Sequence, residues 1–312
     1  MKHIPFIIYR LIASLLVGVS LAIAPVARSQ TPIANPLALT GTWYNPAASG
    51  QGFAFDIAPN SDGSALLFGG WFTYDTPDIF DDQIPLWFTL QGRFQTSQSE
   101  ITVPIYYNGD LDYLAPPLPK PIAVGSARLV FSDCTHATLD YSFSNTRVFL
   151  FAFEPPAGGG TIPLVRLTAD TGCGSAAASP KSSRGFSGTW YNPATTGQGF
   201  VFDINPISNG GFFFGGWFYR SPGFGSWYTL QGRFAPTDTE ADIPLYCSPG
   251  GFFTTTVVAG LSGTTMQCGT THVKFTSCTT ASLSYAFNGS DTPAVTIPLQ
   301  RLTAVPADCP LQ

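Results

Sequence analysis

The chain has 312 residues, of which 14% are aromatic and only 11% are charged, and its formal net charge at pH 7 is −5. Nucleic-acid binding depends on lysine and arginine side chains that neutralise phosphates, so the scarcity of positive charge excludes nucleic acid as a partner. The length suits two domains, each long enough to bury its own core.

The N-terminal segment has the pattern of a secretory signal peptide. Two basic residues within positions 1–10 precede an uncharged apolar stretch over 11–24, and small residues follow before Gln30. We therefore predict a signal peptide over residues 1–29, cleavage near Ser29, and a secreted protein of the periplasm or extracellular space. An uncleaved N-terminal anchor is the alternative. No later stretch predicts a transmembrane segment in the mature chain.

The mature chain is predicted to be all-β. Many short aromatic-rich segments are separated by Gly, Pro, Asn and Ser, and the chain contains 32 glycines and 27 prolines. This is the pattern of strands and turns. No segment after the signal shows the sustained 3.6-residue period of an amphipathic helix.

One unit of the sequence occurs twice. Residues 41–57 and 188–204 are identical at 14 of 17 positions. Later segments match in the same order, among them FGGWF, TLQGRF and TIPLxRLTA. The stretch between the copies is rich in Gly, Ala and Ser, as linkers are. We predict a first domain over 37–173, a linker over 174–187 and a second domain over 188–312.

The repeat also indicates the architecture. Each copy offers about eight short strand candidates, and sequential antiparallel strands must hide their edges. We therefore predict two tandem homologous domains, each an antiparallel β-barrel or β-sandwich, after the signal peptide. Matched glycines such as Gly92 and Gly232 would permit the tight bends that closure requires.

One predicted strand carries the same polar face in both copies. Alternation over residues 86–94 separates one face with Trp, Thr, Gln and Arg from an apolar face, and residues 226–234 repeat it. Identity on an outward face indicates either a fixed hydrogen-bond network or a ligand site. With one matched aspartate in each copy, the candidate ligand-binding residues are Trp87, Gln91, Arg93, Asp56, Trp227, Gln231, Arg233 and Asp203.

The tryptophans and the aspartates each allow more than one interpretation. All six tryptophans form matched pairs, which either fill the core and close a barrel end or provide a ligand platform. Asp56 lies on the strand face opposite Phe53 and Phe55. Its expected partner is an arginine, with Arg93 and Arg166 available, because a buried carboxylate needs compensation. Ligand binding and catalysis are the alternatives.

Two resemblances follow from these motifs. Gly-Thr-Trp-Tyr-Asn with a later Leu-x-Gly-Arg-aromatic resembles avidin-type barrels over those few residues. That family places ligand-binding groups just after the Asn, where this chain has Pro46 and Pro193, so biotin is not the implied ligand. Nearly all of both copies resembles tandem repeats of secreted bacterial proteins that have no assigned activity. The motifs that carry this resemblance are GTWYNPxxxGQGF, GGWF, FxxCT and PLxRLT. This second resemblance implies export and β architecture.

Six cysteines follow the signal segment, and an even number in an exported chain predicts disulfides. Each copy has one cysteine in a late strand and one just after its last strand, and two more occur only in the second copy. No zinc-type spacing such as C-x2-C or H-x3-H is present, so we expect no metal and no cofactor. The predicted bridges are Cys134–Cys173, Cys278–Cys309 and Cys247–Cys268.

Candidates for catalysis are few. His136 and His272 are each absent from the other copy, and no G-x-S-x-G motif occurs. The matched carboxylates Asp56 and Glu100 could serve as a glycosidase pair. Two acidic loops of the first copy lack the fixed ligand spacing of a calcium loop, so they are expected to be solvated.

These observations predict a secreted, non-enzymatic binding or surface-associated protein with two similar domains. Two equal sites would raise avidity, and aromatic rings beside Gln, Asp and Arg suit a carbohydrate or a small planar molecule. An exported hydrolase that uses a carboxylate pair is the alternative. An outer-membrane barrel is a third interpretation, opposed by the predicted disulfides and the non-aromatic C-terminus. No particular oligomeric state follows from the sequence.

Overall fold

A computed structural model gives the fold of most of the chain. The signal peptide predicted for residues 1–29 and the acidic loops around Asp78–Asp82 and Asp110–Asp112 lie outside the described residues. The structure describes residues 34–48, 50–74, 85–98, 100–107, 121–144, 158–169, 172–174, 180–195, 198–221, 224–248 and 265–311.

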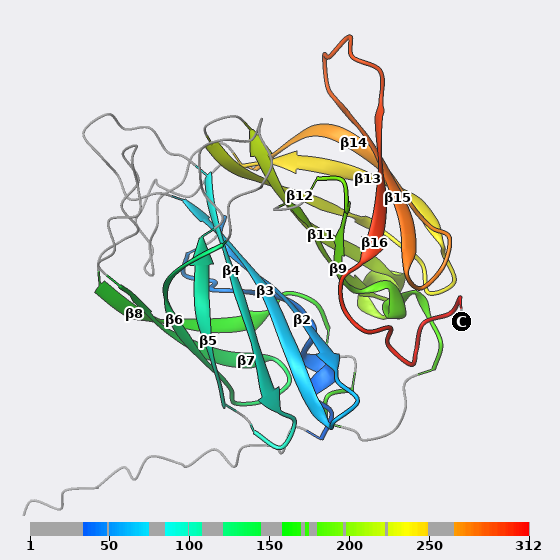
Figure 1. The fold of residues 1–312 in the computed structure, drawn as a ribbon. Helices are drawn as coiled ribbons and strands as arrows, with labels where there is room; N and C mark the ends of the chain where they lie inside the picture. Colours follow the sequence, from blue (N-terminus) through cyan, green and yellow to red (C-terminus); the bar gives the residue numbers. More distant parts are fainter. Residues whose placement is uncertain are drawn as a thin grey trace, which may run out of the picture. The chain divides into compact units, whose positions relative to one another are not determined.

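The first repeat is a closed antiparallel barrel in which sequential strands are neighbours and β1 pairs with β8 (Figure 1). A short 3-10 helix, η1 (Pro36–Leu39), precedes the first strand. The strands are β1 (Gly41–Tyr44), β2 (Gly52–Pro59), β3 (Ser64–Tyr74), β4 (Pro85–Gln95), β5 (Glu100–Tyr107), β6 (Ile122–Phe131), β7 (His136–Phe143) and β8 (Gly158–Arg166).

The second repeat forms a second closed barrel with the same strand order, in which β16 pairs with β9. Its 3-10 helices are η2 (Ser183–Phe186) and η3 (Ser208–Gly210). The all-β prediction with two similar tandem domains is confirmed, and closed barrels replace the sandwich alternative. The strands are β9 (Gly188–Tyr191), β10 (Gly199–Asn205), β11 (Phe212–Ser221), β12 (Phe224–Arg233), β13 (Glu240–Cys247), β14 (Met266–Phe275), β15 (Thr280–Phe287) and β16 (Val295–Arg301).

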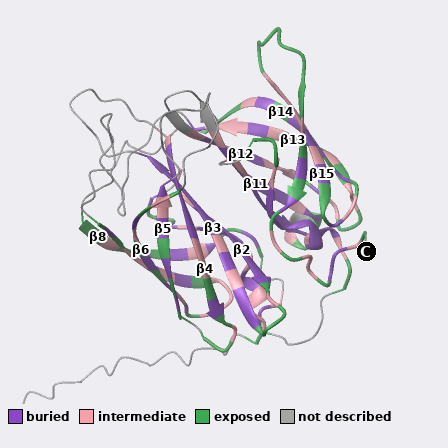
Figure 2. Ribbon diagram, viewed as in Figure 1, coloured by how far each residue is buried: buried purple, intermediate pink, exposed green. Residues whose placement is uncertain are grey.

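Alternation along the strands explains why these segments close into barrels. In β2, Phe53, Phe55 and Ile57 belong to the interior core of the first barrel, whereas Ala54 and Asp56 face outward. Buried residues run along the strands of both barrels (Figure 2). Each interior is filled by aromatic and aliphatic side chains, as is usual for eight-stranded barrels.

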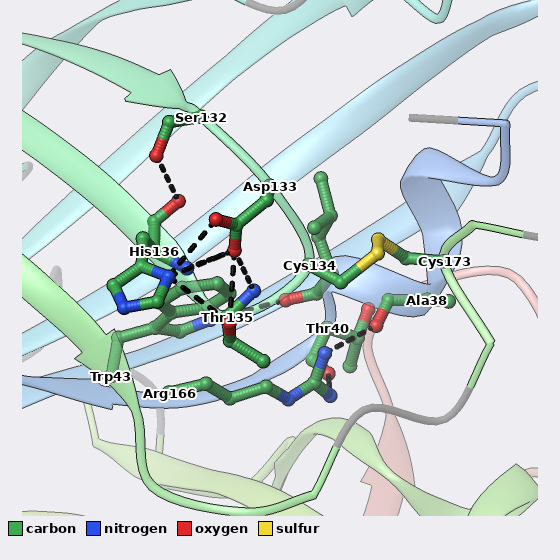
Figure 3. Close-up of a disulfide and its surroundings, with 11 residues drawn as sticks. Ala38, Thr40, Trp43, Ser132, Asp133, Cys134, Thr135, His136, Arg166 and Cys173 are labelled. Carbon is green, nitrogen blue, oxygen red and sulfur yellow. Dashed lines mark hydrogen bonds and ion pairs between the residues drawn. A yellow bond between two sulfur atoms is a disulfide. The ribbon is translucent and has the colours of Figure 1, made fainter. Parts of the chain in front are cut away.

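One end of each barrel, which we call the closed end, is fastened to the 3-10 helix that precedes it. In the first barrel the Trp43 indole donates a hydrogen bond to the Leu39 carbonyl at 3.2 Å. The Arg166 guanidinium donates to the carbonyls of Ala38 at 2.7 Å and Thr40 at 2.6 Å and lies over the Trp43 ring (Figure 3). These bonds satisfy carbonyls that the helix leaves without partners.

The closed end of the second barrel repeats this arrangement. Trp190 donates to the Phe186 carbonyl at 3.0 Å. Arg301 donates to the carbonyls of Ser187, Gly185 and Cys278 at 2.7 to 2.8 Å, and its guanidinium lies 4.7 Å from the centre of the Trp190 ring. The interpretation that a tryptophan closes a barrel end therefore holds for Trp43 and Trp190.

All three predicted disulfides are present. Cys134–Cys173 and Cys278–Cys309 tie each C-terminal segment to the closed end of its own barrel, and Figure 3 shows the first of them beside η1. Cys247–Cys268 joins β13 to β14 at the opposite end of the second barrel. Disulfides of this kind are typical of exported proteins.

A helical membrane span is not found in the described part of the chain, where no helix is both long and apolar enough to cross a bilayer.

Candidate ligand site

The outward face of β4 and its counterpart on β12, which we predicted to bind a ligand, lie against the other barrel. Trp87 and Trp227 are both buried, and each belongs to a hydrophobic cluster shared by the two barrels. This cluster, called the junction cluster below, lies outside both barrel interiors. Its members are Ala54, Phe72, Tyr74, Trp87, Val201, Phe218 and Trp227.

Two phenylalanine rings lie at the centre of the junction cluster. Phe72 and Phe218 occupy matched positions and stack with their centroids 4.7 Å apart and their planes 6° apart. A side chain at Gly70 would overlap the Phe218 ring, and one at Gly216 would overlap the Phe72 ring. The second glycine of FGGWF in each copy is therefore required by close approach of the other barrel.

The two candidate aspartates bind backbone of the opposite repeat. The Asp56 carboxylate accepts hydrogen bonds from the Thr189 amide and the Thr303 hydroxyl, both at 2.8 Å. Asp203 accepts from the Thr42 amide at 2.8 Å and the Thr168 hydroxyl at 3.0 Å. Both aspartates are buried.

The electrostatic partner of Asp56 also comes from the other repeat. Burial raises the pKa of the Asp56 carboxyl, and the positive charge of Arg301 opposes that rise. Burial lowers the pKa of the Arg301 guanidinium to about 10. The expected arginine partner thus belongs to the matched position of the opposite barrel, whereas Arg93 pairs with Asp62 at 3.4 Å on the surface.

The remaining candidate residues form part of a local network on the strand. Gln91 donates to the Thr89 hydroxyl at 3.2 Å, and Gln231 donates to the Thr229 hydroxyl at 3.1 Å. Arg93 is largely solvent-exposed, with a side-chain exposure of 67%, and its counterpart Arg233 is exposed as well. The repeated face therefore combines a fixed hydrogen-bond network with a buried contact surface.

Two hollows open between the barrels. One of about 430 Å³ is lined by both Asp56 and Asp203. The other, of about 200 Å³, is lined by Trp227 and Gln231 together with Gln51 of the first barrel. Because the aspartate oxygens already accept hydrogen bonds across the junction, their main observed role is to hold the barrels together. The ligand-binding role of these residues remains a prediction.

A different pocket lies at the open end of the second barrel, opposite the closed end. It has a volume of about 250 Å³ and is lined by the β9–β10 connection and by strands β10, β11, β15 and β16. Its aromatic lining residues are Phe200, Trp217, Tyr219 and Tyr285, and its polar ones are Asn192, Thr195, Gln198 and Thr296. None of the described residues that line it is charged.

Trp217 is the centre of the aromatic group in this pocket. Tyr285 and Tyr219 meet its ring edge-on, with centroid distances of 4.9 and 5.6 Å, and Tyr228 packs against it at 5.2 Å. Within the described residues, the hydroxyls of Tyr219 and Tyr285 have no hydrogen-bond partner. Burial raises the pKa of the Tyr285 phenol, so this hydroxyl is protonated at neutral pH and can donate a hydrogen bond.

Comparison with families of known proteins and with curated proteins finds no match to this chain. The properties of the site therefore rest on its own geometry. Of the pocket residues, only Trp217 was considered from the sequence, as one of the six matched tryptophans that could provide a ligand platform. Side chains of residues 212–221 alternate between the two faces of the strand, however, and this places Trp217 and Tyr219 on the inward face near the strand end. The polar hydroxyl of Tyr219 in this apolar inward series is a sequence signal that could have indicated the pocket.

The carboxylates proposed for hydrolysis do not meet in one pocket. Asp56 lines the hollow between the barrels, whereas Glu100 lines a surface hollow and binds Arg128 at 2.6 and 2.7 Å. A glycosidase pair must face one substrate from both sides. In the part of the chain that the structure describes, no three His, Cys, Asp or Glu side chains are grouped as metal ligands would be.

Proposed function

We propose that this protein binds a small neutral molecule at the open end of its second barrel. The observation that carries the proposal is the pocket around Trp217, which Tyr219 and Tyr285 help to line and where their hydroxyls have no hydrogen-bond partner among the described residues. Mouths of β-barrels are common places for ligand sites, and eight strands enclose room for one small ligand.

The lining defines the class of ligand. Aromatic rings offer stacking surface, while hydroxyl and amide groups can both donate and accept hydrogen bonds. The described lining residues carry no charge, which disfavours an ionic ligand, because a buried charge would have no counter-ion among them. The pocket is smaller than the roughly 300 to 1,000 Å³ of drug-sized sites. A neutral sugar unit or a small planar heterocycle fits this description.

The proposal includes a location outside the cytoplasm. It is supported by the predicted signal peptide, by three disulfides in the mature chain and by the resemblance to secreted bacterial repeat proteins. Binding without chemistry is the activity we propose, because the described lining consists of stacking and hydrogen-bonding groups.

Calorimetric titration of the oxidised full-length mature chain with neutral sugars and uncharged planar heterocycles tests the proposal. We expect at least one of these compounds to bind. Tyr219→Phe and Tyr285→Phe keep the ring and remove one hydroxyl, so each should weaken binding by about three- to tenfold, the value of one ordinary hydrogen bond.

The control is Tyr141→Phe, which makes the same change at the position of the first barrel that matches Tyr285. It should leave the affinity unchanged if the site lies in the second barrel. Far-UV circular dichroism confirms that each variant is folded. Binding that is indifferent to both second-barrel substitutions, or no binding by any member of the panel, would overturn the proposal.

A further inference from the structure

The contacts between the barrels are reciprocal. Asp56 binds the Thr189 amide and Asp203 binds the Thr42 amide, and these residues are counterparts in the repeat. Phe72 fills the space over Gly216 just as Phe218 fills the space over Gly70. Contacts in which i meets j and j meets i define an isologous interface, the kind found in twofold-symmetric dimers.

The side chains that make these contacts are the same in both repeats. The aspartate, its amide and hydroxyl donors, the glycine, the phenylalanine and the tryptophan are identical at the matched positions. For the contacts that these residues make, each surface therefore presents both halves. The matched sets are Thr42, Asp56, Gly70, Phe72, Trp87 and Thr168, and Thr189, Asp203, Gly216, Phe218, Trp227 and Thr303.

We propose that the junction surface of each barrel is self-complementary, so that it can pair with the same surface of a second copy of this chain. A first barrel meeting another first barrel would stack Phe72 on Phe72. It would also place Asp56 against Thr42 and Thr168, the residues that bind Asp203 within one chain. In the native chain the two surfaces of one molecule satisfy each other, and no disulfide joins one barrel to the other.

Disabling one surface in the full-length chain should expose the other. Phe218→Glu places a charge in the junction cluster and leaves the first barrel's surface intact and free. Phe72→Glu does the reverse, and Phe72→Glu with Phe218→Glu disables both. Both rings lie outside the barrel interiors, so each barrel keeps its core and its disulfides. Sedimentation velocity at several concentrations then gives the mass of each variant.

We expect each single variant to sediment as a dimer of chains at high concentration, and the double variant to sediment as a monomer at every concentration. A single variant with the same mass as the double variant would overturn the proposal. If the wild type already forms a dimer by exchange of barrels, the double variant must abolish it, and a persistent dimer would contradict the proposal.

A second set of variants guards against a local loss of structure caused by the buried charge. Gly216→Leu and Gly70→Leu block the same contacts by overlap with Phe72 and Phe218 and introduce no charge. They should reproduce the pattern of the glutamate variants, with single variants dimeric and the double variant monomeric. Circular dichroism and the absence of free thiols report on folding. A monomeric single leucine variant that passes both checks would count against the proposal.

Discussion

The closed and open ends of the barrels differ in how closely the two repeats agree. At the closed ends the tryptophan, the arginine, the 3-10 helix and the disulfide recur with almost the same hydrogen bonds. At the open ends Tyr219 stands where the first repeat has Thr73, and Tyr228 where it has Phe88. The third disulfide, Cys247–Cys268, also lies at the second open end.

This contrast separates what holds the molecule together from what distinguishes the two halves. Residues that are identical in both repeats fasten the closed ends and form the junction between the barrels. Most of the residues that line the pocket we propose to bind ligand are identical as well, and the lining differs at Thr195, Tyr219 and Val295, where the first repeat has Ala48, Thr73 and Gly160. Identity between copies therefore does not by itself separate scaffold from site, because it includes junction residues such as Trp87 and pocket residues such as Trp217.

The largest effect is expected at the arginines of the closed ends. Arg166→Met and Arg301→Met each remove a buried charge whose hydrogen bonds hold the preceding 3-10 helix, and the charge of Arg301 also compensates the buried Asp56 of the first barrel. Each substitution should lower the free energy of unfolding by about 3 to 5 kcal/mol, measured by urea denaturation of the oxidised chain.

The control for these variants is Arg93→Met, because that side chain is largely exposed. Arg93→Met should change the free energy of unfolding by no more than about 0.5 kcal/mol. If the two closed ends are equivalent, Arg166→Met and Arg301→Met should lower the free energy of unfolding by nearly the same amount. A large loss for one and none for the other would show that the similarity of the two ends is only geometric.

A smaller effect separates the two junction tryptophans. Trp227 donates to the Thr73 carbonyl at 2.9 Å, whereas the buried Trp87 indole nitrogen has no hydrogen-bond partner among the described residues. Trp227→Phe should cost about 1 to 3 kcal/mol more than Trp87→Phe, because it leaves a buried carbonyl unsatisfied. Thermal and urea unfolding measure the stability of both variants. Equal losses of stability would contradict this difference between the two tryptophans.

The smallest effect concerns pH and the surface of the first barrel. The hydrogen bond from Arg128 holds the pKa of Glu100 below its ordinary value, and bonds from Thr161 and Arg128 do the same for Asp140. A carboxylate with a lowered folded-state pKa stabilises the protein above its unfolded pKa and loses this contribution as the pH falls through the folded value. Arg128→Ala should therefore destabilise slightly at pH 7.

The cost of the same substitution should shrink as the pH falls through the lowered folded-state pKa values of these two carboxylates and they become protonated. In the second barrel, Glu240 is held by Lys274 instead. Lys274→Ala serves as the matched comparison and should show a dependence of the same sign. A destabilisation by Arg128→Ala that persists unchanged at low pH would assign the effect to packing of the side-chain stem.

Much of the fold could be predicted because its signals are local or repeated. Alternation assigned Phe53 and Phe55 to one side and Asp56 to the other, and the repeat limited the cysteine pairs to a single consistent scheme. The partner of Asp56 could not be predicted in the same way. A period of two residues says that a side chain points outward, but the surface that covers it depends on how two domains meet.

The pocket at the open end escaped prediction for a related reason. Candidates were chosen because they were identical in both repeats, and that criterion selected Trp87, Gln91 and their counterparts at the junction. Tyr219 has no equivalent in the first repeat, so the criterion passed over it. Tyr285 does have an equivalent, Tyr141, but the sequence does not show that Tyr285 lies at a barrel mouth. That position follows from the barrel topology, which brings Tyr285 of β15 against Trp217 of β11.

The most direct test of this account follows the six indole N–H signals of the ¹⁵N-tryptophan-labelled chain by NMR during titration with a bound sugar or heterocycle. Ligand at the open end of the second barrel should shift the Trp217 signal and leave those of Trp87 and Trp227 in place. Movement of the Trp87 or Trp227 signal with a stationary Trp217 signal would place the ligand at the junction and contradict the account.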